Sequence, residues 1–299
     1  MGKQAYARIT GIVPRELGPG GSRTIMRSAP AHVEEMRWWL GQLPTATDAI
    51  IMENSAITPE LQDLAGHWLQ PNISVLTNTQ PDHQEVWGPT TTSAADVLVK
   101  GLPKNGVVVL PAKLKTDKYL LSLLQNRGCH PIYAIPSPDA EKGYKADNMG
   151  LALTAIEQLQ IATDQAQQAM LNMQPDRYDF HVLNYAGAEL AMAFAANDIS
   201  STRRLFKSLS WSKEETRLIY NHRADRPERF KSFLHWLTQS PWREVLIIGD
   251  KPYNRISSCR YLKLKNEKGL KELFHPGDRI FGCGNISGLP QLLTAAPGQ

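Results

Sequence analysis

The chain has 299 residues, of which 42% are hydrophobic and 21% are charged, a composition typical of globular proteins and unlike that of disordered or fibrous ones. The formal net charge is only +4, with no basic tract interleaved with aromatic residues, so we expect no nucleic-acid partner. No apolar run reaches the length of a membrane span, and the opening MGKQAYARITG lacks a signal-peptide core. The three cysteines lack CxxC spacing, which fits reduced thiols in a cytoplasmic protein.

The first half of the chain alternates short apolar runs with amphipathic segments. Gly18-Pro19-Gly20-Gly21 is expected to form a hairpin turn, and Trp38 and Trp39 are expected to pack into the core from one helix. Near-continuous β-branched runs separated by helices predict a parallel sheet covered on both faces. The expected strands are 49–54, 72–78, 106–111 and 130–136, and the expected helices are 59–69, 90–102, 117–127 and 148–161.

The second half repeats this α/β pattern. A proline and several polar residues interrupt the pattern between 169 and 180, so we place a domain boundary there, with domains at 1–172 and 173–299. Strands are expected within 190–198, at 216–223, at 244–250 and at 278–285, with helices after them. The sequence therefore predicts an α/β fold with a central parallel-sheet domain and a smaller, Rossmann-like C-terminal domain.

Polar side chains gather where two strands of the first domain are expected to end. Glu53 ends one strand, Asn78 ends the next, and Asp82 and His83 come later in the same loop. Ligands of parallel sheets bind at the carboxyl ends of strands, and carboxylates with an imidazole can hold a divalent cation completed by water or phosphate oxygens. The alternative is that Asn78 and Asp82 form an Asx turn while His83 stacks on Trp87. We favour the site for the group as a whole.

The second domain offers three further candidate segments. Asn197 and Asp198 are expected to end a strand and open a helix that contains Ser201 and Thr202, which suits an anion site or a plain N-cap. Arginines beside an acidic residue suit phosphate or carboxylate recognition, although a surface ion-pair cluster explains them equally well. Glycines around Asn285 allow close approach of a ligand to the backbone. The candidates in these last two segments are Arg223, Asp225, Arg226 and Asn285.

Several segments, in the same order, resemble blocks of the Mur ligase superfamily and, within it, of the poly-γ-glutamate synthase family. NTQPDH (78–83) resembles the superfamily's Asn-x-x-x-Asp-His motif. VWGPT (86–90), FAANDISST (194–202) and NHRADR (221–226) resemble blocks that separate the poly-γ-glutamate synthases from peptidoglycan ligases and folylpolyglutamate synthases. IIMENSAITPELQ (50–62) and GCGNISG (282–288) also match, and the resemblance extends from about Thr10 to Leu293.

The resemblance implies a Mur-ligase-like central domain and an ATP-dependent ligase that joins a carboxylate to an amine through an acyl phosphate. Glutamate or polyglutamate would be the substrate, and membrane subunits of a synthase complex would recruit the chain to the inner face of the membrane. Glu53 and His83 would bind Mg²⁺, and Asp82, His83 and Asp198 would act in catalysis. Nucleotide or phosphate contacts would come from Asn78, Asn197, Ser201, Thr202, Arg223, Asp225, Arg226 and Asn285.

The sequence departs from this family at one essential point. The family holds the ATP phosphates in a G-x-x-G-K-[ST] loop, and no such sequence occurs in these 299 residues. YARITGIVPREL resembles the family's segment on the C-terminal side of that loop and its helix, so the central domain is expected to lack its first strand, the loop and the first helix. A truncated start, a split enzyme whose partner chain carries the loop, and a degenerate homologue all remain open. A non-catalytic assembly subunit and a metal-dependent hydrolase are the alternative functions.

Overall fold

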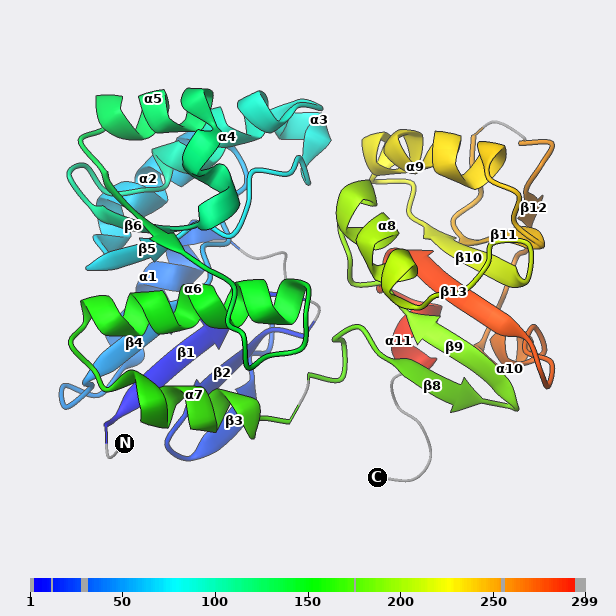
Figure 1. Ribbon diagram of the computed structural model, residues 1–299, viewed down its shortest axis with the longest axis horizontal. Coiled ribbons are helices and arrows are strands. Elements are labelled where there is room, and N and C mark those ends of the chain that lie inside the picture. The colour runs from blue at the N-terminus through cyan, green and yellow to red at the C-terminus, as the bar shows by residue number, and fades with distance from the viewer. Residues whose placement is uncertain (1–2, 12, 28–31, 175, 254–255, 294–299) are drawn as a thin grey trace. The chain divides into compact units, whose positions relative to one another are not determined.

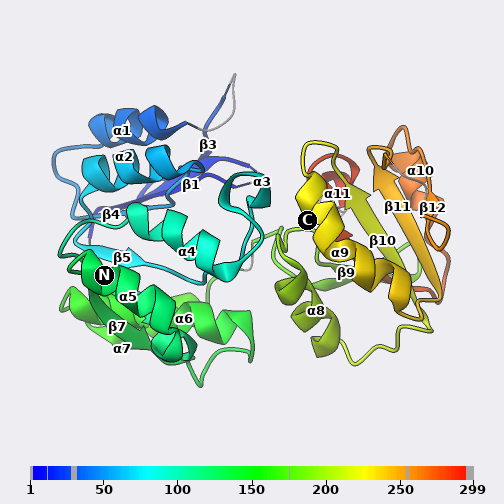
Figure 2. The same ribbon diagram turned by 90° about the horizontal axis from the view of Figure 1, so that it is seen from above.

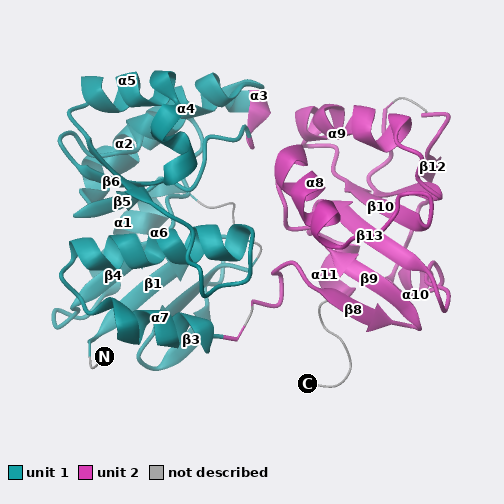
Figure 3. Cartoon of the chain, viewed as in Figure 1, with its two compact units in different colours: residues 1–81, 86–173 teal, residues 82–85, 174–299 magenta. Residues whose placement is uncertain are grey.

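The computed structural model describes residues 3–11, 13–27, 32–174, 176–253 and 256–293. Figure 1 shows the helices and strands. The chain forms two compact units, one of residues 1–81 and 86–173 and the other of residues 82–85 and 174–299 (Figure 3). The short segment 82–85 therefore groups with the C-terminal unit, although its neighbours in sequence belong to the first. Each unit is an α/β structure.

The first unit begins with a four-stranded sheet of order β3-β2-β1-β4. Its strands are β1 (Ala5–Ile9), β2 (Arg15–Gly18), β3 (Gly21–Thr24) and β4 (Ala49–Met52). The hairpin between β2 and β3 is confirmed, with Gly21 at a φ of +102°, and β4 pairs with β1 in parallel. Helices α1 (Val33–Gln42) and α2 (Pro59–Leu69) pack together in one apolar cluster with Met52.

The two neighbouring tryptophans of α1 have different surroundings. Trp39 is buried, and its indole N–H donates to Glu16 at 2.9 Å. Trp38 is 60% exposed, so the prediction of a core position is wrong for this residue. Adjacent positions on a helix point about 100° apart, and the apolar stripe that includes Val33, Met36 and Trp39 is the one that faces the core.

The other strands of this unit form a separate parallel sheet of order β5-β6-β7. The strands are β5 (Ile73–Val75), β6 (Val107–Pro111) and β7 (His130–Ala134). The expectation of one continuous sheet is therefore corrected, because no described strand is hydrogen-bonded between β4 and β5. The helices of this region are α4 (Thr91–Lys100), the 3₁₀ helix Ala112–Thr116, α5 (Lys118–Asn126), α6 (Tyr144–Gln158) and α7 (Thr163–Leu171). The short helix α3 (Gln84–Trp87) begins in segment 82–85 and ends in the first unit.

The ends of the helices agree with local sequence signals. Thr58 caps α2 by accepting from the backbone N–H of Leu61 at 3.3 Å, and Pro59 occupies the first helical position, where its missing N–H costs nothing. Thr90 and Ser93 form a reciprocal capping box at the start of α4. Glycine allows α2 and α4 to approach closely, because a Cβ at Gly66 would lie only 2.8 Å from the Lys100 carbonyl oxygen.

We expect Gly66→Ala to lower the free energy of unfolding by about 1–3 kcal/mol, because the added methyl group forces the two helices apart and overpacks their contact. The matched control is Gly41→Ala in α1, where a Cβ meets nothing within 4 Å and the higher helix propensity of alanine should stabilise the protein by about 0.5–1 kcal/mol. Urea unfolding of the two variants measures the difference. Equal effects would show that α2 and α4 do not pack as described.

The C-terminal unit contains a six-stranded sheet of order β12-β11-β10-β13-β9-β8, parallel except for the pair β8 and β9. The strands are β8 (Val182–Tyr185), β9 (Ala188–Met192), β10 (Thr216–His222), β11 (Glu244–Gly249), β12 (Arg260–Tyr261) and β13 (Arg279–Gly284). The helices are α8 (Ile199–Ser208), α9 (Pro227–Gln239), α10 (Glu267–Lys271) and α11 (Leu289–Leu293). One aromatic core, which includes Phe206, Phe233, Trp236 and Phe281, joins α8 and α9 to the central strands.

Candidate functional site

The site is built where β10 and β13 end side by side in the C-terminal unit. The two strands are parallel, with Asn221 opposite Gly284, so the segments beyond them start at one edge of the sheet. The buried Asn221 amide donates to the carbonyl oxygens of Asn285 and Ser287 at 2.6 and 2.8 Å. In return, the Asn285 side chain donates to the Asn221 carbonyl at 3.1 Å. This exchange fixes the loop after β13 against β10.

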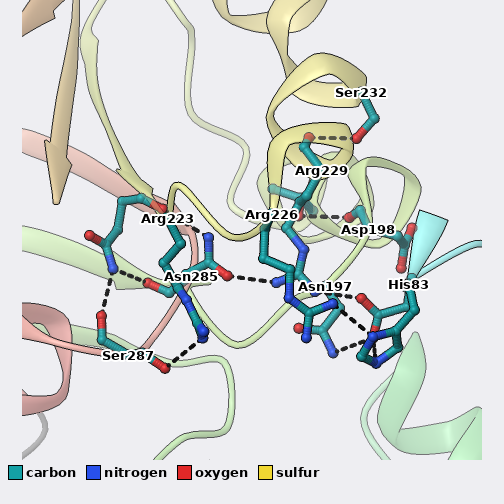
Figure 4. Close-up of polar contacts among 12 residues, drawn as sticks. His83, Asn197, Asp198, Arg223, Arg226, Arg229, Ser232, Asn285 and Ser287 are labelled. Atoms are coloured by element: carbon teal, nitrogen blue, oxygen red, sulfur yellow. Dashed lines mark hydrogen bonds and ion pairs between the residues drawn. The ribbon is translucent and has the colours of Figure 1, made fainter. Parts of the chain in front are cut away.

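Arg229, on the first turn of α9, connects this edge to the loop that holds Asp82. Its guanidinium donates to Asn285 Oδ1 at 2.8 Å (Figure 4). It also forms an ion pair with Asp82 Oδ1. The second oxygen of Asp82 accepts from the Asn197 amide at 3.2 Å. The Arg229 side chain is only 6% exposed, so Asp82 is held by a buried cation that cannot lose its charge.

His83 lies beside a second arginine. Arg226 Nη1 donates to His83 Nδ1 at 2.8 Å, and His83 Nε2 lies 3.7 Å from Asp82 Oδ2. Burial lowers the pKa of His83, Asp82 opposes that shift, and the charges of Arg226 and Arg229 add to it. The imidazole is therefore kept neutral, with the ring nitrogen that faces Arg226 acting as acceptor.

Arg223 and Asp225 form the ion pair that was one of the two interpretations of their sequence. Two guanidinium nitrogens of Arg223 contact the carboxylate at 2.9 and 2.6 Å, and Nη1 also reaches Ser287 Oγ at 3.3 Å. Burial raises the pKa of Asp225, but the hydrogen bond and charge of Arg223 outweigh this and hold the pKa below its usual value. Both side chains are well exposed, so the pair is open to exchange with an anionic ligand.

Asp198, Ser201 and Thr202 together build the start of α8. Asp198 Oδ1 accepts from the Ser201 N–H at 2.7 Å, and the buried Thr202 hydroxyl donates to the Asp198 carbonyl at 2.9 Å. These contacts are those of an N-cap. The expectation that Asn197 and Asp198 end a strand is wrong, because β9 stops at Met192 and the chain turns, with the Ala196 N–H bonded to the Ala193 carbonyl at 3.1 Å.

Glu53 and Asn78 lie in the first unit. Glu53 follows β4 directly, but Asn78 does not end a strand as expected, because β5 stops at Val75. Glu53 is exposed and accepts from the backbone N–H of Thr10 at 2.6 Å. Asn78 Oδ1 accepts from the Gln80 N–H at 2.8 Å, which is the geometry of an Asx turn. Glu53 and Asn78 belong to one unit and Asp82 and His83 to the other, so their joint site remains a prediction.

Of the two residues predicted to bind magnesium, Glu53 suits the ion better than His83 does. Among the described residues, no three His, Cys, Asp or Glu side chains form a metal-binding group. Magnesium in nucleotide sites commonly uses one or two carboxylates, with water and phosphate oxygens completing the shell, and the exposed Glu53 carboxylate suits that set. His83 suits it less in the present arrangement, because Arg226 donates to one ring nitrogen and the other lies beside Asp82.

The sequence interpretation missed two residues of the site, Asn221 and Arg229. A signal for Arg229 was present. Arg229 lies four residues before Phe233 and seven before Trp236, on the same face of the helix, and both aromatic side chains are buried. A cation placed in an apolar stripe must have a buried partner. No comparable signal marked Asn221, since a single amide within an apolar strand has many structural roles.

His222, at the end of β10, should make the stability of the protein depend on pH. Burial lowers its pKa from 6.5, although Asp250 and Asp225 oppose the shift. As the pH falls below 6.5, the unfolded chain takes up a proton that the folded chain does not, so the free energy of unfolding decreases until the folded-state pKa is reached. We expect His222→Gln to reduce this slope by at most one proton, or about 1.4 kcal/mol per pH unit. Urea unfolding between pH 5 and 8 (roughly the range of histidine titration) measures it, and an unchanged slope would contradict the assignment.

None of the helices in the described part of the chain is long and apolar enough to cross a membrane. The model of the poly-γ-glutamate synthase CapB C-terminal domain matches residues 180–298. The PGA synthase CapB of Bacillus subtilis (strain 168) is 28% identical over 275 residues, which cover 82% of this chain and 70% of that protein. The capsule biosynthesis protein CapB of Bacillus anthracis is 30% identical over 201 residues, which cover 62% of this chain and 43% of that protein.

Solved structures share the fold at low sequence identity. The MurF ligase of Thermotoga maritima in complex with ADP superposes with a TM-score of 0.68 at 12% identity, over 98% of this chain and 74% of that one. A bifunctional folylpolyglutamate synthase/dihydrofolate synthase with Mn, AMPPNP and L-glutamate bound gives a TM-score of 0.66 at 12% identity, over 98% and 83%. The α/β fold predicted from the sequence is thus confirmed. The resemblance seen in the sequence is also confirmed: residues 180–298 match the CapB C-terminal domain, most of the chain is similar to CapB proteins, and the fold is that of the Mur ligases and folylpolyglutamate synthases compared.

Proposed function

We propose that the chain is the greater part of an ATP-dependent carboxylate–amine ligase that joins glutamate units by amide bonds. The similarity of the chain to a PGA synthase and to a capsule biosynthesis protein carries this proposal. In the reaction, ATP phosphorylates a glutamyl carboxylate, and the amine of an incoming glutamate attacks the acyl phosphate and releases phosphate. Glutamate or polyglutamate is the substrate, and partner subunits bring the enzyme to the inner face of the membrane.

The arginines of the C-terminal unit suit the handling of phosphoryl groups. Phosphoryl transfer depends on positioning and on cations that neutralise the developing charge. Arg223 can exchange its exposed carboxylate partner for a phosphate, and Arg226 lies beside the neutral His83. Asp82, fixed by Arg229 and Asn197, orients this loop. Magnesium, when bound with ATP, would help to neutralise the charge of the phosphates, and Glu53 is the described carboxylate that we propose would hold it.

The ATP phosphates need a further element. No stretch of these 299 residues matches G-x-x-G-K-[ST]. In proteins that have such a loop, its backbone N–H groups and its lysine supply most of the phosphate contacts. We therefore propose that the loop is supplied by a polypeptide segment outside these residues. Residues 1–299 alone should accordingly bind Mg-ATP weakly or not at all.

The test combines binding and turnover. Calorimetry of residues 1–299 with Mg-ATP is expected to show no tight binding, and an affinity in the submicromolar range would contradict the need for a further segment. The same chain, joined to or mixed with a segment that carries G-x-x-G-K-[ST], is expected to release ADP and to extend glutamate into amide-linked polymer, measured by mass spectrometry. If several such assemblies bind Mg-ATP but form no glutamyl amide, the chain is an assembly subunit and the ligase proposal is wrong.

A further inference from the structure

The edge of the C-terminal sheet that β12 forms carries a concentration of positive charge. Residues 251–271 contain seven lysines and arginines and one acidic residue, so the formal net charge of this segment, +6, is larger than that of the entire chain, +4. Figures 1 and 2 show β12 at the margin of the sheet, where it pairs with β11 alone among the described strands. A surface with one dominant sign of charge attracts partners of the opposite sign.

The chain that leaves β12 presents a row of lysines to solvent. The Leu262 N–H donates to the Ile247 carbonyl at 2.9 Å, so the chain continues along the edge of the sheet beyond the strand. Lys263, Lys265 and Lys268 follow, and all three are exposed. Their side chains form no ion pair with a described residue. The ammonium groups of this row therefore keep their full attraction for an external anion.

A cavity of about 840 Å³ lies between the end of α9 and the strands β11 and β12, and its lining includes three further cations, Arg243, Lys251 and Arg260. Arg243 and Arg260 contact Asp278 and Glu244, each at 2.9 Å. Both arginine side chains are more than half exposed, and exposed ion pairs are weak enough to exchange partners. The volume is that of a ligand site, so the cavity can hold part of a larger anionic molecule.

The surroundings of these cations favour a polymer of carboxylates over other polyanions. Single-stranded nucleic acids stack their bases on aromatic side chains. The partly buried Tyr261 donates its hydroxyl to the Gly249 carbonyl at 3.2 Å, which leaves Tyr253 as the fully exposed aromatic residue in the described part of this segment. A membrane surface requires exposed apolar side chains that insert into it, whereas Leu262 and Leu264 are partly buried. Carboxylates require only the cations.

We propose that Lys251, Arg260, Lys263, Lys265 and Lys268, here called the β12 surface, bind the growing amide-linked glutamate polymer. This inference rests on the proposed function, in which each added glutamate keeps one free carboxylate that is ionised at neutral pH. Once one carboxylate is bound, its neighbours meet the other cations at a high effective concentration, so weak contacts combine into a stable one. A polymer held in this way stays on the enzyme between additions and grows longer before it dissociates.

The experiment titrates residues 1–299 with purified poly-γ-glutamate of uniform length, without ATP. Calorimetry gives the dissociation constant, and NMR shifts of backbone amides locate the contact. We expect the amides of 260–268 to shift, the affinity to fall as salt screens the charges, and free glutamate, which lacks the multiple contacts, to bind far more weakly. Lys263→Gln, Lys265→Gln and Lys268→Gln together should weaken binding by about 10-fold or more, since each exposed ion pair contributes a small amount.

The matched control removes three positive charges from exposed positions elsewhere in the same unit. Arg203→Gln, Lys207→Gln and Lys231→Gln lie on α8 and α9, and together they should change the affinity by no more than about 2-fold, because charges beyond a Debye length are screened. Equal losses in the two triple variants, or amide shifts confined to other segments, would overturn the proposal. Duplex DNA or anionic phospholipid vesicles that bind as tightly as the polymer, through the same lysines, would overturn it too.

Turnover tests the role of the β12 surface in elongation. In an assembly that makes glutamyl amides, the variant with all three lysines replaced is expected to yield shorter polymer for the same amount of ADP released, and polymer of wild-type length would contradict that role. Binding is measured without ATP, so the two proposals can fail separately. A chain that binds the polymer but forms no glutamyl amide in any assembly would count against the ligase function alone. Amide synthesis by a chain that does not bind the polymer would count against the β12 surface alone.

Discussion

Replacing Arg229 by methionine is expected to lower the free energy of unfolding of the C-terminal unit by about 2–4 kcal/mol. The substitution keeps the apolar stem but removes the cation that lies between Asp82 and Asn285. Breaking a buried ion pair from one side costs about 3–5 kcal/mol, because the remaining charge keeps its desolvation penalty. The Asp82 side chain is 25% exposed, so water can hydrate the unpaired carboxylate and offset part of that cost.

Arg223→Met is the matched control for this prediction. It removes the same group from an ion pair whose two side chains are 37% and 59% exposed, where the contribution is usually below about 1 kcal/mol. Urea unfolding gives both values. It is monitored through the hydrogen exchange of β10 amides, so that only the unfolding of the C-terminal unit is measured. If the two variants lose equal stability, Arg229 does not hold the site together in the way that its contacts indicate.

The order of helices and strands could be predicted from the sequence because local signals determine it. Helix α2 occupies the predicted range 59–69, since Thr58, Pro59 and a 3.6-residue apolar period agree. The separation of the first unit into two sheets could not be predicted in this way. Strand pairing depends on which edges meet, and runs such as 49–54 and 72–78 look the same whether or not a neighbour lies between them.

The site shows the same division between local and distant information. The ends of β10 and β13 were recognisable, because an apolar run stops at polar residues in 220–226 and 281–288. The partner of Asp82 was not, because Arg229 lies 147 residues away along the chain. Asn78 and Asp198, by contrast, make short-range turn and cap contacts, and their sequence patterns are equally those of simple turns and helix starts.

The prediction on which the function depends concerns His83. In an assembly that contains the glycine-rich loop and makes glutamyl amides, we expect His83→Ala to lower the rate by about 100-fold or more, as the loss of a group that orients a phosphoryl site or a metal shell commonly does. Stability should change little, because His83 is only partly buried and makes one hydrogen bond, to Arg226, that is itself only partly buried. Arg223→Ala and Asp198→Ala should also slow turnover, although Asp198→Ala also removes an N-cap worth about 1 kcal/mol.

His235→Ala is the control, because His235 lies exposed on α9 and has no part in the site. ADP release and polymer length are measured for each variant, with urea unfolding as the check on folding.

The dependence of the rate on pH tests whether the His83 imidazole must be neutral for the reaction. Its pKa is already lowered by burial and the neighbouring arginines, so a wild-type rate that falls as the pH drops below 6.5 and is independent of pH in His83→Ala would show that the neutral ring is required. If His83→Ala retains the wild-type rate while Arg223→Ala does not, the arginines handle the phosphoryl group without His83, and its assignment as a catalytic or metal-binding residue is wrong.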